Sequence, residues 1–445
     1  MLLLNFVPCI IILLNTCIAL ATKCTPFQYN TGNFESNVEN LKTLLEPFTS
    51  SWPIYNNTTV PSSGKLIEQF QKGKADPDVH LNFTQLVTKY GYPVEQHQVI
   101  TEDQYCLTLF RIPRPNAPVV FLMHGVLCSS DDWITIGQEK GLAYTLYDAG
   151  YDVWLGNARG NKHSRCNLHL SPDCAEFWKF SFEEIGLYDI PAMIDYALEN
   201  TGKSKLLYVG HSQGTTSFYV MTSMRPEYND KIAFMVCLSA VVFMSHVRSP
   251  LIQLISPFEN DVEALAELVG GYEVAPRDAF IDALTSTFCG SPELAELFCE
   301  SIIYVLSGFN YPQLNASVLP VIYSHYPAGS SIYQLVHYAQ ETNSGKFGRF
   351  DYGVTGNLAK YNAIVPPNYP LDKVRCPMAI FYSNNDWLTS APDIVTFLKQ
   401  LPNVIEFYHV PCASFMHFDY IFGKDSDVLV NKEILSLLAK YKNDS

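Results

Sequence analysis

Three side chains of this 445-residue sequence could together form an activated nucleophile. Ser212 lies in the run Gly210-His211-Ser212-Gln213-Gly214, which fits the pattern G-x-S-x-G. A serine hydroxyl attacks a carbonyl only when a histidine takes its proton and a carboxylate orients that histidine. Downstream, Asp386 and His417 follow in the order serine, aspartate, histidine. Such a set performs acyl transfer through a covalent intermediate.

The serine must be held by a strand, a tight turn and a helix. Residues 206–210 form an apolar run, and a helical stretch follows over 215–224. The glycines on both sides of Ser212 let the backbone fold back, which predicts a nucleophile elbow. The alternative is a glycine-rich turn in which the serine is a bystander.

The proposed carboxylate, Asp386, follows a predicted strand over 378–383. It therefore falls at the carboxyl edge of the sheet. Asp393 is a poorer candidate because Pro392 indicates that a helix has already begun there. An ordinary turn carboxylate is the alternative for Asp386.

The proposed base, His417, lies in the loop after a predicted strand over 404–410, which Pro411 ends. His409 lies within that strand and is expected to pack. Other interpretations of His417 are a hydrogen-bonded loop histidine or, together with Asp419, a metal ligand. We predict no metal, because no third ligand is nearby and the sequence contains no C-x-x-C.

Donors for the oxyanion are predicted from two backbone amides. A strand over 118–123 runs into His124-Gly125, and Gly125 lets the chain turn so that the Val126 amide faces the site. The second donor is the amide of Gln213, directly after the nucleophile. A plain tight turn is the alternative for Gly125.

A series of short motifs extends from about residue 76 to near the C-terminus. They are Gly91-Tyr92-Pro93, Val99-Ile100-Thr101-Glu102-Asp103, residues 150–161, Phe177-Trp178, Phe180-Ser181-Phe182, Tyr188-Asp189, Ser324-His325, Pro327-Ala328-Gly329, Gly345-Lys346-Phe347 and His417-Phe418-Asp419-Tyr420. With the elbow, this set resembles the acid lipase family, which includes lysosomal acid lipase and gastric lipase.

The resemblance implies an α/β-hydrolase with a mostly parallel sheet, flanking helices and an inserted helical cap. It implies Ser212, Asp386 and His417 as the triad, and the amides of Val126 and Gln213 as the oxyanion hole. The family usually has leucine where Val126 stands, a difference that a backbone donor tolerates. It also implies a disulfide between Cys289 and Cys299, at a spacing one residue longer than usual.

Composition narrows the possible partners. The chain has 29 Lys and Arg against 44 Asp and Glu, a formal charge of −15. This balance disfavours nucleic acid and a polybasic membrane anchor, so any attraction to lipid must be apolar. A second candidate disulfide joins Cys166 to Cys174, although connectivity cannot be read from sequence. Buried free thiols are expected elsewhere.

The N-terminus predicts entry into the secretory pathway, with a lysosomal or extracellular destination. Residues 1–21 resemble a signal peptide that ends in Ala19-Leu20-Ala21. A transmembrane anchor is the alternative, but the span is short and broken by polar residues and a proline. No such anchor is expected after signal removal. Five sequons support secretion, at Asn56, Asn57, Asn82, Asn315 and Asn443.

The remaining chain divides into an N-terminal extension and a core with an insertion. Residues 22–75 are an extension or a propeptide, 76–242 and 371–445 form the hydrolase core, and 243–370 interrupt the strand pattern. In the insertion apolar side chains recur at helical spacing, at Leu294, Leu297, Phe298, Ile302 and Val305. It is a cap and lid over the site or an ordinary helical subdomain.

The sequence predicts a lipase that hydrolyses esters of long-chain fatty acids, triacylglycerol or cholesteryl ester, at a lipid–water interface. No cofactor is expected. Alternatives are another carboxylesterase or a thioesterase on the same fold, or a lipid-binding or storage protein without catalysis. Oligomeric state is not predicted.

Overall fold

The structure, a computed structural model, describes residues 63–269, 271–274, 306–307 and 310–444. Several predicted features lie outside these residues. They are the signal peptide over 1–21, most of the extension over 22–75, the sequons Asn56 and Asn57, the pair Cys289 and Cys299, and the apolar repeat at Leu294, Leu297, Phe298, Ile302 and Val305.

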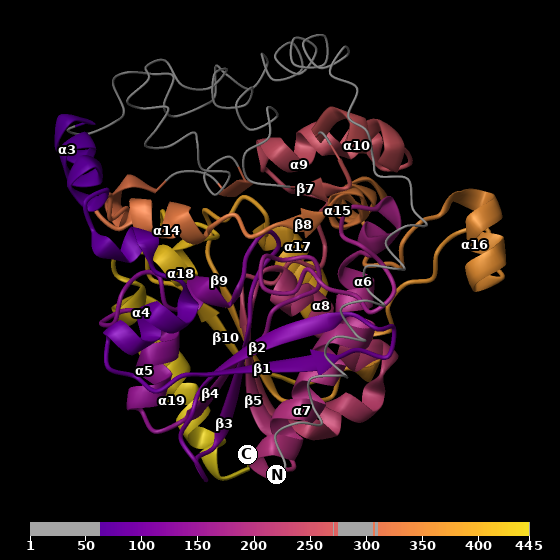
Figure 1. Cartoon of the computed structure of the whole chain (residues 1–445). Helices are drawn as coiled ribbons and strands as arrows, with labels where there is room; N and C mark the ends of the chain where they lie inside the picture. The colour runs from indigo at the N-terminus through magenta and orange to yellow at the C-terminus, as the bar shows by residue number, and fades with distance from the viewer. Residues whose placement is uncertain (1–62, 270, 275–305, 308–309, 445) are drawn as a thin grey trace, which may run out of the picture.

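A twisted sheet forms the centre of the described chain (Figure 1). Its strand order is β1-β2-β4-β3-β5-β6-β9-β10. The strands are β1 (Glu95–Ile100), β2 (Cys106–Ile112), β3 (Val119–Met123), β4 (Asp152–Leu155), β5 (Leu206–His211), β6 (Ile232–Leu238), β9 (Met378–Tyr382) and β10 (Val404–His409). From β4 to β10 the neighbours are parallel, whereas β1 and β2 add antiparallel pairs at one edge. The mostly parallel sheet predicted from the sequence is confirmed.

Burial along the strands follows their place in the sheet. The central strands β3, β5 and β6 are buried at every position, as expected for strands covered on both faces. The edge strands β1 and β10 instead alternate half-buried and exposed residues. The continuous apolar runs of the sequence therefore mark the middle of the sheet.

Helices cover both faces of the sheet (Figure 1). One layer contains α4 (Phe83–Lys89), α5 (Leu142–Asp148) and α19 (Lys432–Lys440), and the other contains α7 (Ile190–Thr201), α8 (Gln213–Met224) and α17 (Ala391–Leu398). Their apolar faces form two hydrophobic clusters, one on each side of the strands. No helix in the described part of the chain has both the length and the apolar content that a membrane span requires.

Most of the described chain between β6 and β9 lies above the sheet (Figure 1). It contains α9 (Pro250–Ile255), α10 (Val262–Val269), β7 (Glu273–Val274), α14 (Leu319–His325), β8 (Ser330–Ser331), α15 (Ile332–Ser344) and α16 (Gly353–Tyr361). Strand β7 pairs with β8, and α15 packs against α9 and α10. Helix α16 projects from the side of the molecule. Elsewhere, α3 (Ser63–Gly73), α6 (Phe182–Glu184) and α18 (Asp419–Phe422) are short connecting elements.

The predicted pairing of Cys166 with Cys174 is wrong. Cys166 forms a disulfide with Cys106, at the start of β2. The two lie side by side because the Cys106 amide donates to the Cys166 carbonyl at 2.9 Å, next to a bridge between Tyr105 and Asn167. These cysteines are 60 residues apart in sequence, so spacing alone did not indicate the bond.

Candidate active site

Ser212 occupies a strained turn between β5 and α8. Its φ is 53° and its ψ is −121°, a conformation that side chains other than glycine rarely adopt. The turn needs glycine on both sides. A Cβ on Gly214 would lie 2.3 Å from the Met123 carbonyl oxygen, and one on Gly210 would lie 2.9 Å from the Gly214 oxygen. The G-x-S-x-G spacing therefore has a steric cause here.

His417 and Asp386 meet at the same edge of the sheet. Nδ1 of His417 lies 2.9 Å from Oδ2 and 3.1 Å from Oδ1 of Asp386. The His417 ring is fully buried, and its Nε2 has no hydrogen-bond partner among the described residues. Because Nδ1 faces a carboxylate, Nε2 is the nitrogen left to accept a proton.

His211 connects this pair to the elbow. Its Nε2 lies 2.8 Å from the His417 carbonyl oxygen, and the two rings are 4.8 Å apart at their centroids. Since His211 directly precedes Ser212, the contact brings the His417 segment against the nucleophile turn. Burial lowers the pKa of His211 to about 3, helped by the neighbouring charge of His417, so its ring stays neutral.

Asp386 is held as a carboxylate. Burial opposes its ionisation, but attraction to His417 and hydrogen bonds from His417 and Ser239 outweigh burial and lower its pKa to about 2. The amides of Leu388 and Thr389 also donate to Oδ1, at 2.9 and 3.0 Å. Asp386 is therefore charged across the range in which enzymes work.

The alternative aspartate and histidine lie elsewhere. Asp393 accepts from the His246 amide and lies 2.8 Å from its ring, and it also accepts from the hydroxyl of Ser390, the N-cap of α17. His409 lies in β10, with its ring 4.8 Å from that of Tyr382. Neither residue contacts the Asp386–His417 pair. Of these aspartates and histidines, Asp386 and His417, which follow strands β9 and β10, are the two in contact with each other.

Ser239 is a site residue that the sequence motifs did not indicate. Its Oγ lies 2.7 Å from Nδ1 of His417 and hydrogen-bonds to Oδ2 of Asp386. The predicted core segment continued to residue 242, but its last strand, β6, ends at Leu238, and Ser239 turns away with a φ of 56°. The sequence did contain one indication of this role: Ser239 is a small polar residue at the end of β6, which pairs with the elbow strand β5.

One predicted oxyanion amide, of Gln213, belongs to the elbow itself, and the other, of Val126, belongs to the loop after Gly125. Within the described chain neither the Val126 nor the Gln213 amide donates a hydrogen bond. A Cβ on Gly125 would lie 3.0 Å from Cβ and 3.4 Å from Oγ of Ser212, so this loop packs directly on the nucleophile. Unpaired amides at such a position are available to an incoming oxygen.

The loop that carries Val126 is fixed from two directions. The Ala328 amide, from the chain between α14 and α15, donates to the Leu127 carbonyl at 2.6 Å. On the other side, Nε2 of His124 accepts from the Ala158 amide and from Asn161, both at 3.1 Å. Burial lowers the pKa of His124 to about 4, which keeps that nitrogen an acceptor.

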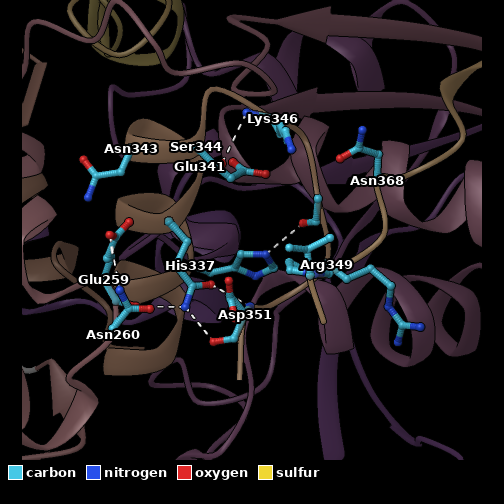
Figure 2. A pocket seen from close by; sticks show the side chains of 14 residues that line it. Glu259, Asn260, His337, Glu341, Asn343, Ser344, Lys346, Arg349, Asp351 and Asn368 are labelled. Carbon is cyan, nitrogen blue, oxygen red and sulfur yellow. Dashed lines mark hydrogen bonds between the residues drawn. The ribbon is translucent and has the colours of Figure 1, made fainter. Parts of the chain in front are cut away.

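Ser212 opens into an apolar pocket. The other lining residues are Val126, Leu127, Val241, Met244, Ile252, Leu306, Leu335, Tyr338 and Leu388. A second, polar pocket surrounds Glu341 on another side of α15 (Figure 2). Burial raises the pKa of Glu341 well above its ordinary value, but that pocket contains no part of the elbow. The apolar pocket is therefore the one that an attacking serine can serve.

An elbow serine at the edge of such a sheet, with a paired histidine and aspartate, is the arrangement of an α/β-hydrolase. The family model described as "alpha/beta hydrolase fold" matches residues 118–423, more than half of the chain. A second model, "Partial alpha/beta-hydrolase lipase region", matches residues 83–137.

The curated relatives give the family more closely. Lipase 3 of Drosophila melanogaster is 41% identical over 359 residues, which cover 79% of this chain and 91% of the relative. Gastric triacylglycerol lipase of Rattus norvegicus is 36% identical over 402 residues, 87% of this chain and 100% of the relative. The chain therefore belongs to the lipase family of α/β-hydrolases, and the resemblance noted in the sequence is confirmed.

Proposed function

We propose that this protein is a lipase that hydrolyses carboxylic esters of long-chain fatty acids, triacylglycerol or cholesteryl ester. One observation carries the proposal: Ser212, in a strained elbow, lines an apolar pocket, and the preceding His211 is bonded to the backbone of His417, whose buried Nε2 has no partner among the described residues. A nucleophile that opens into an apolar space suits an acyl chain better than a polar substrate.

Ser212, His417 and Asp386 have separate roles in this mechanism. The Ser212 hydroxyl attacks the ester carbonyl while His417 Nε2 takes its proton, and a tetrahedral oxyanion forms. The amides of Val126 and Gln213 donate to that oxyanion, each contributing about 3 kcal/mol to the transition state. Asp386 holds the ring and stabilises the imidazolium.

The cycle closes with water. His417 returns its proton to the leaving alcohol, the C–O bond breaks, and an acyl-enzyme remains on Ser212. Water then gives a proton to His417 and attacks the acyl carbon. The bond from that carbon to Ser212 Oγ breaks while His417 returns the proton to Oγ, which releases the fatty acid and restores the serine. These steps consume one water per ester and use no cofactor.

The chain above the site acts as a cap in this proposal. Met244 and Ile252 precede or belong to α9, Leu335 and Tyr338 belong to α15, and all four line the Ser212 pocket. Elements that cover a catalytic pocket with apolar side chains can open where they meet lipid. An ordinary carboxylesterase or a thioesterase remains the competing function, because the same machinery serves both.

We further propose a secretory destination, lysosomal or extracellular. The disulfide between Cys106 and Cys166 supports it, because such bonds persist in oxidising compartments. Among the sequons in the described chain, Asn82 and Asn443 are exposed and Asn315 is half-buried. Treating secreted protein with peptide N-glycosidase should lower its mass, and an unchanged mass would remove this support.

The experiment compares the wild-type protein with Ser212→Ala on emulsified triolein, cholesteryl oleate and a water-soluble short-chain ester. The wild type should prefer the long-chain esters, and the variant should lose at least a thousandfold in kcat at unchanged Tm. Equal turnover by the variant would refute the mechanism. A strong preference for the soluble ester would favour the carboxylesterase alternative.

A further inference from the structure

Helix α16 presents its apolar side chains to solvent. Val354 and Leu358, one turn apart, are 61% and 48% exposed, and Ile364 and Val365, just after the helix, are 63% and 59% exposed. The buried residue of this helix is the polar Asn357. A surface helix normally does the reverse, with its apolar stripe against the core.

This inversion is built into the local structure. Asn357 accepts from the Tyr352 amide at 3.0 Å and donates to Asp351 Oδ1 at 2.8 Å and to the Ile364 carbonyl at 3.3 Å. The Tyr361 hydroxyl donates to the Phe350 carbonyl at 2.9 Å. These bonds tie the segments before and after the helix to its buried side. The opposite side, which carries the apolar residues, therefore faces solvent.

Exposed apolar side chains are concentrated at this place. Eleven large hydrophobic residues are exposed in the described chain, and five of them, Tyr352, Val354, Leu358, Ile364 and Val365, lie within 14 residues of one another. We call these five the α16 patch. The other six are spread between Ile100 and Val428. Contiguous patches of this kind mark binding surfaces, whereas scattered residues do not.

The charge around the α16 patch is unlike that of the whole chain. Residues 352–368 contain one charged side chain, Lys360, in a protein with a net charge of −15. Its Nζ lies 2.9 Å from the Tyr352 hydroxyl and 4.3 Å from the ring centroid. Carboxylates also lie near it in space, because Asp351 accepts from the Gly353 amide and Asn357, and Glu184 lines a hollow with Tyr352 and Lys360. The exposed apolar side chains with Lys360 beside them suit contact with lipid headgroups.

The shape of this region also favours lipid over protein. Figure 1 shows α16 as a projection at the side of the molecule. A stable protein partner needs about 800 Å² on each side, mostly flat and well packed. Five side chains on a projection expose only a few hundred Å², which is too little for such an interface. Insertion into a lipid surface has no such requirement.

We propose that the α16 patch inserts into the lipid surface and holds the enzyme there during catalysis, an inference that rests on the proposed lipase function. Only residues 345–352 separate α16 from α15, whose Leu335 and Tyr338 line the Ser212 pocket. The lipid contact thus belongs to the segment that directly follows the helix lining the acyl site.

Flotation with phosphatidylcholine-stabilised triolein droplets tests the contact without hydrolysis. All proteins carry Ser212→Ala. The patch variant combines Val354→Ser, Leu358→Ser, Ile364→Ser and Val365→Ser, and the matched control combines Ile100→Ser, Val395→Ser, Ile405→Ser and Val428→Ser, all at exposed positions. We expect the patch variant to lose about tenfold or more in droplet partitioning, and the control to stay within about twofold of the parent.

Two results would overturn the proposal. One is equal flotation of the patch variant and the control. The other is a dimer in sedimentation experiments that the patch substitutions dissociate, because a second copy would then cover the patch. With Ser212 restored, the patch variant should keep its rate on a soluble ester and lose rate on droplets. If the protein with Ser212 intact had no esterase activity, patch-dependent flotation would still support the lipid contact, and only the lipase function would be refuted.

Discussion

The Oγ of Ser239 lies 2.7 Å from Nδ1 of His417 and also hydrogen-bonds to Asp386. One hydroxyl thus contacts both partners of the nucleophile. It donates to the carboxylate, because Nδ1 itself carries the proton that faces Asp386. The left-handed backbone of Ser239, at a φ of 56°, is what turns this hydroxyl toward the pair.

Removing that hydroxyl should slow catalysis while the fold is kept. Ser239→Gly is the appropriate change, because glycine tolerates the positive φ and alanine would add strain. We expect kcat to fall about tenfold, the worth of one charge-assisted hydrogen bond, with KM nearly unchanged. Activity at the lowest pH, near the Asp386 pKa of about 2, should also fall at a higher pH than in the wild type, since Asp386 loses a donor that keeps its pKa low. A normal rate and pH profile would show that Ser239 has no positioning role.

Gly125 and Val126 should respond in opposite ways to substitution. Gly125→Ala places a methyl 3.0 Å from the Ser212 Cβ, so it must displace the nucleophile or the oxyanion loop. We expect a loss of about a hundredfold in kcat. Val126→Ala keeps the backbone amide and should cost less than about threefold. Steady-state kinetics on one soluble ester measures both. A larger loss for Val126→Ala than for Gly125→Ala would contradict the oxyanion assignment.

The neighbouring aspartates Asp131 and Asp132 should have opposite effects on stability. Burial raises the pKa of Asp132 from 3.8 to about 7, and its Oδ2 has no partner among the described residues. A pKa raised on folding gives stability that is complete below pH 3.8 and is lost as the pH rises toward 7. At about 1.4 kcal/mol per pKa unit the loss reaches at most about 4 kcal/mol. Asp132→Asn should remove this loss and raise the Tm at pH 7.

Asp131→Asn is the control for that prediction. Burial opposes ionisation of Asp131, but hydrogen bonds from His163 and His325 and the charge of Lys162 hold its pKa well below the ordinary value. Its stabilising contribution is present at neutral pH and is lost only in strong acid. The asparagine variant should therefore lower the Tm at pH 7. Thermal melts from pH 4 to 7 measure both variants, and shifts of the same sign at pH 7 would contradict the account.

Much of the fold could be predicted because the central strands are apolar along their whole length. The runs at β3, β5 and β9 begin and end within a residue or two of their predicted limits. The end of β6 could not be predicted, since the apolar residues continue past Leu238 although the backbone turns at Ser239. Hydrophobicity reports burial, and it does not distinguish a buried strand from a buried loop.

For the site, order along the chain predicted which side chains meet, because the carboxyl ends of parallel strands share one edge. Asp386 and His417 follow β9 and β10 and lie in contact. Contacts made across the sheet or from the chain between β6 and β9 gave no local signal. Two such contacts join segments far apart in sequence: the Cys106–Cys166 disulfide and the hydrogen bond from the Ala328 amide to the Leu127 carbonyl. The exposure of the apolar side chains of α16 could not be predicted either, because the spacing of apolar residues does not say which side of a helix faces solvent.

Covalent capture tests the central claim most directly. A long-chain alkyl phosphonate ester, incubated with the intact protein and followed by peptide mass spectrometry, should add one phosphonyl group to the peptide containing Ser212 and abolish ester hydrolysis in proportion. Asp386→Asn and His417→Ala should slow this labelling by several orders of magnitude. Stoichiometric labelling at another residue, or full hydrolysis after Ser212 is modified, would contradict the account.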